Sequence, residues 1–196
     1  MKKVLTIAMC FIFCNCGFSQ NKTDKSYRNF PLIVSIQFHS LTLPFKNFGS
    51  NFSNVGIGLG TEVSHNGSRN WVQQFNIAWF RNKAVGDGIL ISTQTTWRPA
   101  IIHNVSGEIK AGIGYQYSYR PVESFRSVNG KWTSVNHKGK GMLAIPVGIG
   151  AGYNKYSENA FVSPFAGYQL IILKGYSKSI PIVPETVVEL GSRIHF

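Results

Sequence analysis

One short segment of the chain contains the three residue types of a hydrolytic triad. Glu62, His65 and Ser68 lie close together in the sequence, and an acid that orients a histidine can activate a serine hydroxyl for attack on an ester. Such a site is defined by geometry, so closeness in sequence is weak support for it. The intervening Asn66-Gly67 pair is a tight-turn signal. We therefore expect a turn here and no catalytic residue, with a hydrolase as the alternative.

A second group of charged residues occurs at alternating positions in segments that are otherwise apolar or small. Charges on the inner face of a strand need partners, because an isolated buried charge is strongly unfavourable. We therefore expect salt bridges and hydrogen bonds that fill an interior, with an ion or proton path as the alternative. His39 and His195 are expected on the same face, but without a ligand-spacing motif they predict no metal site. The candidate network consists of Glu62, Glu108, Lys110, Glu189 and Arg193.

Strands must position these side chains, because apolar residues recur with a period of two. In the segment 186–196, Leu190 and Ile194 alternate with Glu189 and Arg193, and successive strand residues point to opposite faces. Strands that cross a membrane need only about 9–11 residues. The sequence predicts strands at 32–43, 54–64, 71–81, 89–97, 105–119, 143–153, 161–173 and 186–196.

The less apolar face of these strands is rich in glycine. Glycine inside a strand is unfavourable unless another segment crowds against it, and the interior of an eight-stranded barrel is just wide enough for side chains. A narrow barrel therefore explains this face better than a secreted β-sandwich. Aromatic residues near the strand ends match the girdles of membrane barrels. The glycines are Gly56, Gly58, Gly60, Gly112, Gly114, Gly148, Gly150 and Gly152, and the aromatics are Trp71, Trp79, Trp97, Tyr119, Tyr153 and Phe196.

The fold predicted from these patterns is all-β. We expect an antiparallel up-and-down transmembrane β-barrel of eight strands, closed by the C-terminal strand that ends in Phe196. Pro146 and Pro164 lie inside expected strands and count against the register there, since proline cannot donate to the ladder. A bulge is one way to accommodate either proline.

The connections alternate between short turns and longer loops, as in barrels with short periplasmic turns and long external loops. The longest loop, 120–142, is basic, and lipopolysaccharide phosphates are a nearby partner that Lys and Arg bind well. Asn129-Gly130 predicts a hairpin that extends above the membrane, where Trp132 would be available to a protein partner. The candidate contacts for lipopolysaccharide or a protein are Arg120, Arg126, Lys131, Trp132, Lys138 and Lys140.

Residues 1–19 have the pattern of a secretory signal peptide. Lys2 and Lys3 precede the apolar run 4–14, which is too short for a spanning helix, and cleavage is expected between Ser19 and Gln20. A retained anchor helix and a lipoprotein are the alternatives. All three cysteines fall in this segment, so the mature chain is expected to have no disulfide. Residues 20–29 are then a short periplasmic tail, and residues 30–196 form the barrel.

With this leader, these alternating strands and the terminal Arg193-Ile194-His195-Phe196, the chain resembles small outer-membrane β-barrel proteins of the type common in Bacteroidetes and Proteobacteria. The resemblance implies residence in the outer membrane of a Gram-negative cell. It also implies insertion by the barrel-assembly machinery, which reads the terminal strand. It does not imply one function, because such barrels include structural anchors, adhesins, lipid A enzymes and accessory subunits.

We expect a non-enzymatic barrel that interacts with lipopolysaccharide or serves as an accessory subunit of a larger outer-membrane complex. A lipid A-modifying enzyme, and a narrow pore or channel for small hydrophobic molecules, are the alternatives. No cofactor and no nucleic-acid partner are expected. The formal net charge is +12, and removal of Lys2 and Lys3 with the signal peptide lowers it to +10.

Overall fold

The computed structural model describes residues 30–40, 52, 54–65, 69–81, 86–119, 124–128, 130–135, 139–154, 160–176 and 181–196. The expected signal peptide and periplasmic tail lie outside the described residues. Within the described ranges every regular element is a β-strand. None of these ranges contains a helix long and apolar enough to cross a membrane.

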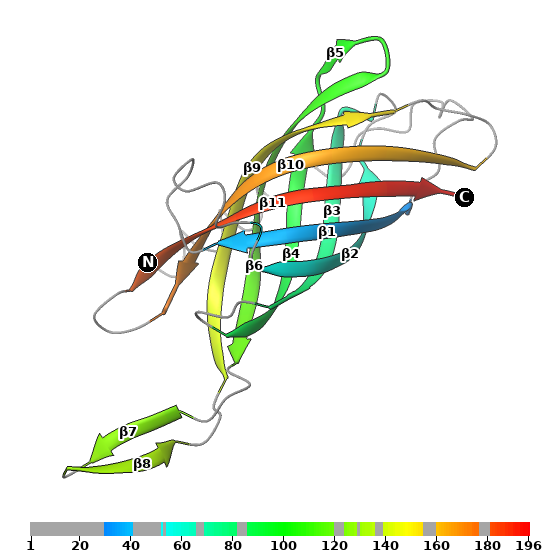
Figure 1. Ribbon diagram of the computed structural model, residues 1–196. Helices are drawn as coiled ribbons and strands as arrows, with labels where there is room; N and C mark the ends of the chain where they lie inside the picture. Colours follow the sequence, from blue (N-terminus) through cyan, green and yellow to red (C-terminus); the bar gives the residue numbers. More distant parts are fainter. Residues whose placement is uncertain are drawn as a thin grey trace, which may run out of the picture.

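Eight antiparallel strands form a closed barrel (Figure 1). Each strand of the ring pairs with the next one along the chain, β4 pairs with β6, and β11 closes the ring by pairing with β1. The predicted all-β, up-and-down barrel of eight strands is therefore confirmed. The strands of the ring are β1 (Leu32–Ser40), β2 (Val55–Ser64), β3 (Trp71–Phe80), β4 (Asp87–Trp97), β6 (Val105–Tyr119), β9 (Lys140–Tyr153), β10 (Phe161–Lys174) and β11 (Ile182–His195).

Three short strands stand outside the ring. β5 (Ala100–Ile102) pairs with β6 where the sequence predicts only a turn. β7 (Ser124–Val128) and β8 (Lys131–Val135) form a separate two-stranded sheet, which confirms the predicted hairpin in the longest loop. Gly130 at its tip has a φ of 77°, a conformation that glycine adopts at no steric cost. Figure 1 shows β5 and the β7–β8 hairpin at opposite ends of the barrel.

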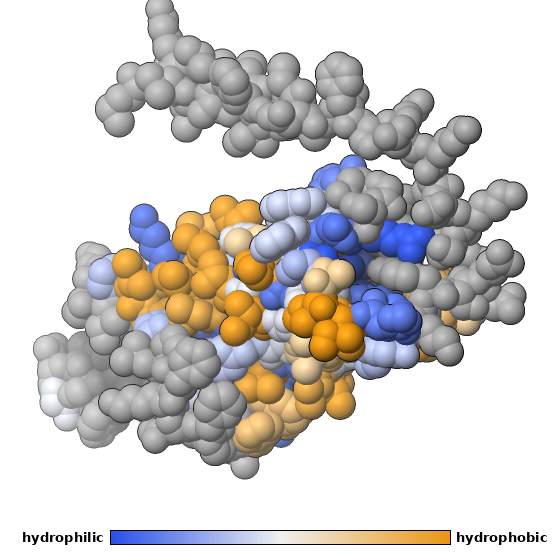
Figure 2. All heavy atoms as spheres, turned by 90° about the horizontal axis from the view of Figure 1, so that it is seen from above, coloured by the Kyte–Doolittle hydropathy of each residue, from blue (hydrophilic) through white to orange (hydrophobic). Residues whose placement is uncertain are grey.

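The alternation of side chains separates an apolar outside from a polar inside. In β3, Phe75 and Ile77 are exposed, whereas Gln74 and Ala78 are buried. Apolar residues accordingly cover much of the visible surface in Figure 2. This arrangement is the one expected of a barrel whose outer wall meets lipid.

Three strands begin earlier than the sequence predicts, and the first of them, β4, begins at Asp87 and not at residue 89. β9 begins at Lys140 and not at residue 143, and β11 begins at Ile182 and not at residue 186. The longer β11 includes Glu185, whose side chain is buried. Thr186, expected on the outer face, is also buried and donates a hydrogen bond of 3.3 Å to the backbone oxygen of Ser40.

Neither proline requires a bulge, because each lies where its missing N–H is not needed. Pro146 pairs with Ile171 of β10, whereas on the β6 side the ladder omits the pairs at Pro146 and Ile145 and then resumes in the same register. Pro164 pairs with Ser192 of β11 and lies just before the ladder between β10 and β9, which begins at the next residue. A proline without a backbone donor is tolerated at such positions.

Candidate functional site in the barrel interior

Two glutamates and two arginines form the centre of the barrel interior. Arg98 donates from Nη1 to Oε1 of Glu62 at 2.8 Å and from Nη2 to Oε2 of the same carboxylate at 2.5 Å. The Arg98 Nε donates to Oε1 of Glu108 at 3.1 Å. Arg193 of β11 reaches both carboxylates, with Nε 3.3 Å from Oε2 of Glu62 and Nη2 donating to Glu108. Residues from three strands and one turn are therefore tied together across the interior.

Lys110 extends this network along the barrel axis. Its Nζ lies 3.3 Å from Oε2 of Glu108 and 3.5 Å from Oε2 of Glu189. Gln169 and Gln37 also donate to Glu189, at 2.9 Å and 3.3 Å. Among the described residues of this network, three carboxylates therefore meet three cations, and all six side chains are buried. A balanced, hydrogen-bonded set is the condition under which charges are tolerated in an interior.

The Phe165 ring packs against two of these cations. The Lys110 Nζ lies 4.8 Å from the ring centroid, and the Arg193 guanidinium carbon lies 4.3 Å from it. Cations over an aromatic face at these distances are stabilised by the ring quadrupole. Phe165 therefore closes one side of the network with a surface that is apolar but still favours positive charge.

A second polar cluster surrounds His39 nearer the end of the barrel that carries β7 and β8. His39 Nδ1 lies 2.8 Å from Oε1 of Glu185, and Nε2 lies 3.1 Å from Oε1 of Gln37. Gln116 donates to the second oxygen of Glu185 at 3.1 Å, and the His39 ring stacks on Phe80 at 4.0 Å between centroids. The cluster is connected to the charged network through Gln37.

The two inward histidines lie far apart. His39 pairs with Val187 of β11, and His195 lies eight residues further along that strand, or about 26 Å at 3.3 Å per residue. His195 stacks on Phe161 at 4.2 Å between ring centroids. Among the described residues, no group of three or more His, Cys, Asp or Glu side chains is arranged to hold a metal ion.

An apolar layer fills the interior toward the same end as His39. Its side chains are buried and packed together, and Tyr176 and Val183 pack against them. This layer and the charged network place buried side chains at successive levels of the interior, as expected for a barrel of eight strands. The layer consists of Ala78, Phe80, Leu90, Met142, Ala144, Ile171, Leu173 and Val187.

Of the proposed Ser/His/acid arrangement, the structure describes Glu62 and His65. Both carboxylate oxygens of Glu62 are bound by Arg98 inside the barrel, whereas His65 lies exposed beyond the end of β2. Ser68 lies outside the described residues. An acid already held by an arginine is not available to orient a histidine.

The residues that sequence reasoning missed are Arg98 and Glu185. Arg98 follows β4 directly and continues the inward alternation of Ser92, Gln94 and Thr96, so the parity of the strand was a usable signal. Glu185 lies one residue before the predicted start of the last strand at residue 186, in a stretch that reads as a loop.

The candidate contacts of the external loop are only partly described. Lys140 is exposed at the start of β9, and its Nζ donates to the backbone oxygen of Tyr176. Arg126 belongs to β7, and Lys131 and Trp132 belong to β8, with only their backbone described. The two others, Arg120 and Lys138, lie outside the described residues.

A closed ring of eight antiparallel strands with an apolar outer wall is the fold of small outer-membrane β-barrel proteins. Neisserial surface protein A has this fold, with a TM-score of 0.55 and 12% identity over 85% of this chain and 97% of that one. The attachment invasion locus protein Ail of Yersinia pestis aligns with a TM-score of 0.51 and 16% identity over 86% of this chain and 98% of that one. No family model and no curated protein matches the chain by sequence.

Proposed function

We propose that this chain is a non-enzymatic outer-membrane barrel with a sealed interior, which acts through its external hairpin by binding lipopolysaccharide. The observation that carries the proposal is the filling of the lumen by the charged network and the apolar layer. A barrel whose described interior is occupied by paired side chains has its outer surfaces left for function. Binding through the loops is therefore the role that the geometry supports best.

Residence in the outer membrane is supported by the outer wall. Trp71 and Trp97 stack at one end of the barrel, with ring centroids 6.2 Å apart. Near the other end, the Trp79 indole N–H donates to the Tyr119 hydroxyl at 3.2 Å. Amphipathic aromatics at both ends of an apolar wall mark the two interfaces of a membrane. The signal peptide, cleaved between residues 19 and 20, would deliver the chain to the periplasm.

The orientation of the barrel favours an external position for the β7–β8 hairpin. Short turns join the strands at the end where β11 finishes, and the long connection that contains β7 and β8 lies at the other end (Figure 1). Barrels of this kind place short turns in the periplasm and long loops outside. The basic hairpin would then lie beside the phosphates of lipopolysaccharide.

The chemistry of the hairpin suits an anionic lipid. Residues 120–140 contain five basic residues and one acidic residue, Glu123, counting His137 as neutral. Lys and Arg form charge-assisted hydrogen bonds with phosphate, and Arg does so with two parallel donors. Trp132 adds an aromatic side chain of the kind that anchors proteins at an interface. The second candidate role of this surface is to bind a protein partner in a larger complex.

The proposal is tested by removing charge from the hairpin and from the first residue of β9. The triple variant Arg126→Gln, Lys131→Gln and Lys140→Gln is purified in dodecyl maltoside beside the native protein, and each is titrated with lipopolysaccharide. We expect the triple variant to bind at least about tenfold more weakly, because each lost cation removes a charge-assisted contact with phosphate. Equal binding by the native protein and the variant would overturn the proposal.

A matched control removes the same number of charges elsewhere. Lys22→Gln, Lys25→Gln and Arg28→Gln change the expected periplasmic tail, and lipopolysaccharide should bind this variant as it binds the native protein. Mass spectrometry of the native complex extracted from membranes tests whether the hairpin binds a protein partner instead. A protein recovered at fixed stoichiometry, and lost with the hairpin variant, would replace lipopolysaccharide as the partner.

The assembly of the barrel supplies a second proposed partner. Phe196 follows the last paired residue of β11, and its side chain is 59% exposed. An aromatic at this position is free to be recognised by the barrel-assembly machinery before the strand closes the ring. The contact between Phe196 and the assembly machinery would be transient. It would be lost once the barrel has closed.

A further inference from the structure

A group of polar side chains interrupts the apolar outer wall of the barrel. The outer face of β3 carries one amide among aromatic and aliphatic side chains, in the order Trp71, Gln73, Phe75, Ile77 and Trp79. Thr93 and Thr95 lie at outward positions of the neighbouring strand β4. The Gln73 Nε2 donates to Oγ1 of Thr93 at 2.6 Å, and Oγ1 of Thr95 donates to the Gln73 Oε1 at 2.8 Å. Gln73, Thr93 and Thr95 therefore form one hydrogen-bonded unit on the outside of the barrel, the wall cluster.

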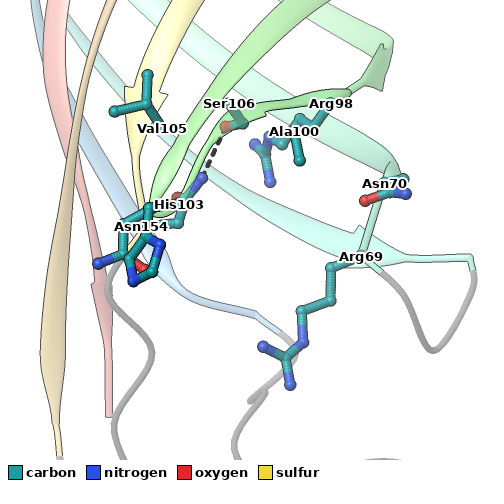
Figure 3. Close-up of a pocket in the computed structure, with 9 residues that line it drawn as sticks. Arg69, Asn70, Arg98, Ala100, His103, Val105, Ser106 and Asn154 are labelled. Atoms are coloured by element: carbon teal, nitrogen blue, oxygen red, sulfur yellow. Dashed lines mark hydrogen bonds between the residues drawn. The ribbon is translucent and has the colours of Figure 1, made fainter.

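Two tryptophans mark the interface nearest to the wall cluster. Trp71 stacks on Trp97, with ring centroids 6.2 Å apart. Directly beyond them along β3 and β4, Asn70 and Arg98 line a small polar pocket at the end of the barrel (Figure 3). The change from the apolar wall to a polar surface therefore falls at this pair of tryptophans, as expected of an aromatic girdle.

Positions along the strands place the wall cluster within the hydrocarbon layer. Trp79, which lies near the opposite interface, is eight residues from Trp71, or about 26 Å of extended chain. Gln73 lies two residues inside Trp71. Thr93 lies four residues inside Trp97, which is half of the eight-residue span. The wall cluster therefore extends from near one interface toward the middle of the membrane.

The Gln73 amide has hydrogen-bonding capacity that the wall cluster does not use. A primary amide has two N–H donors, and its oxygen accepts two hydrogen bonds. The bonds to Thr93 and Thr95 use one donor and one acceptor position. Lipid chains offer neither donors nor acceptors, and water is absent at this depth. A polar group on a second protein is therefore the source from which the remaining donor and acceptor can be satisfied.

A second copy of this chain has the matching groups. Two Gln73 amides that face each other across a two-fold axis each donate one N–H and each accept one, so the patch is complementary to itself. The ester carbonyl of a lipid accepts a hydrogen bond but donates none. Ala111, the exposed neighbour of Thr95 on β6, is small enough to let two walls approach closely. Hydrogen bonds between polar side chains, with small residues beside them, hold membrane proteins together.

We infer that the wall cluster is the centre of an interface between two copies of this barrel within the membrane. The Gln73 amides lie at the two-fold axis, and the exposed Phe75 and Trp71 pack around them. The inference goes beyond the proposed function, because it uses residence in a membrane and not the hairpin. Polar contacts in membranes are individually weak, so the dimer forms reversibly.

The first test measures self-association of the mature protein by sedimentation equilibrium in a neutrally buoyant detergent. We expect a monomer–dimer equilibrium that Gln73→Leu weakens by at least about fivefold, because both hydrogen bonds across the axis are lost. The control Ser192→Ala removes a polar outward side chain of β11 and should dimerise like the native protein. A native protein that stays monomeric at all concentrations, or a Gln73→Leu variant that dimerises like the native protein, would overturn the inference.

Loss of the fold is separated from loss of the interface in the same variant. Leucine is favourable on a wall that meets lipid, so Gln73→Leu should fold and should keep native lipopolysaccharide binding. This test and the test of the hairpin can therefore fail independently. A dimer weakened together with loss of the folded barrel would overturn the assignment of Gln73 to the interface.

Cysteine cross-linking in native outer membranes tests the position of the interface. All three cysteines lie in the expected signal peptide, so one introduced cysteine reports on one position. Phe75→Cys changes an exposed residue beside Gln73, whereas Ala166→Cys changes an exposed residue of β10, which three strands separate from β3 in either direction. We expect oxidation to link only Phe75→Cys into dimers. Monomeric Phe75→Cys, or equal dimers from Ala166→Cys, would overturn this position, and a link to another protein would overturn the second copy as the partner.

Discussion

Arg98 and Glu62, which lie 36 positions apart in the sequence, form a bidentate ion pair inside the barrel, with N–O distances of 2.8 and 2.5 Å. The pair connects the turn after β4 to β2 and is one link of a network that reaches β6 and β11. Its members are buried, so each charge depends on the others for compensation. The network therefore serves as part of the core of this barrel.

Removing one member of this pair should destabilise the protein strongly. Arg98→Gln removes the bidentate partner of Glu62, although the Arg193 Nε at 3.3 Å and the Gln74 amide at 3.0 Å stay beside the carboxylate. We expect a loss of about 3 kcal/mol in the free energy of unfolding, as for other broken buried pairs. Urea unfolding in lipid vesicles, followed by tryptophan fluorescence, measures this change. The exposed Lys140→Gln is the control and should be within about 0.5 kcal/mol of native. An Arg98→Gln variant as stable as this control would show that the network does not support the fold.

Glycine on the inner face should be required where the network needs space. A Cβ at Gly152 would lie 3.1 Å from Oε1 of Glu108 and 3.2 Å from Nη1 of Arg193. Gly152→Val should therefore cost about 2 kcal/mol by overpacking. Ala151→Val, one residue away and exposed on the outer face, is the matched control and should be nearly neutral. The same unfolding measurement compares the two, and equal stabilities would contradict the crowding that we describe.

The terminal aromatic should matter for assembly in cells and not for the stability of the folded barrel. Phe196 lies beyond the last ladder pair, Phe161 with His195, and is exposed. Phe196→Ser should reduce the amount of protein in the outer membrane, because the assembly machinery would recognise the strand less well. Refolding from urea into detergent should proceed as in the native protein. A normal amount of the Phe196→Ser variant in the outer membrane would contradict the proposal that the assembly machinery recognises β11 through this residue.

The strands of the ring were predictable because one face of the wall meets lipid and the other meets a polar interior. Apolar and polar residues therefore alternate along each strand with a period of two. Val105 to Tyr119 is predicted with the bounds that β6 has, since apolar and polar residues alternate throughout that segment. The start of β11 was not predictable in this way. Its first residues contain Pro184 and an acidic residue, Glu185, which resemble a loop until the partner His39 is known. A buried glutamate is recognised only by the cation or donor that compensates it.

Most members of the interior network were predictable from the sequence, but Arg98 and the connections between the members were not. Five of its residues lie at inward positions of strands and are found from parity alone. Arg98 lies just after a strand, where a sequence-based boundary ends the alternation one residue too soon.

The central claim, that the barrel is sealed, is tested most directly by electrical recording. The purified protein is inserted into planar lipid bilayers. Its folded state is verified on a gel, where the folded protein resists unfolding by detergent in the cold. We predict no discrete conductance steps, because the charged network and the apolar layer together fill the lumen. Reproducible single-channel steps from inserted native protein would contradict this claim and would make a narrow pore the function to pursue.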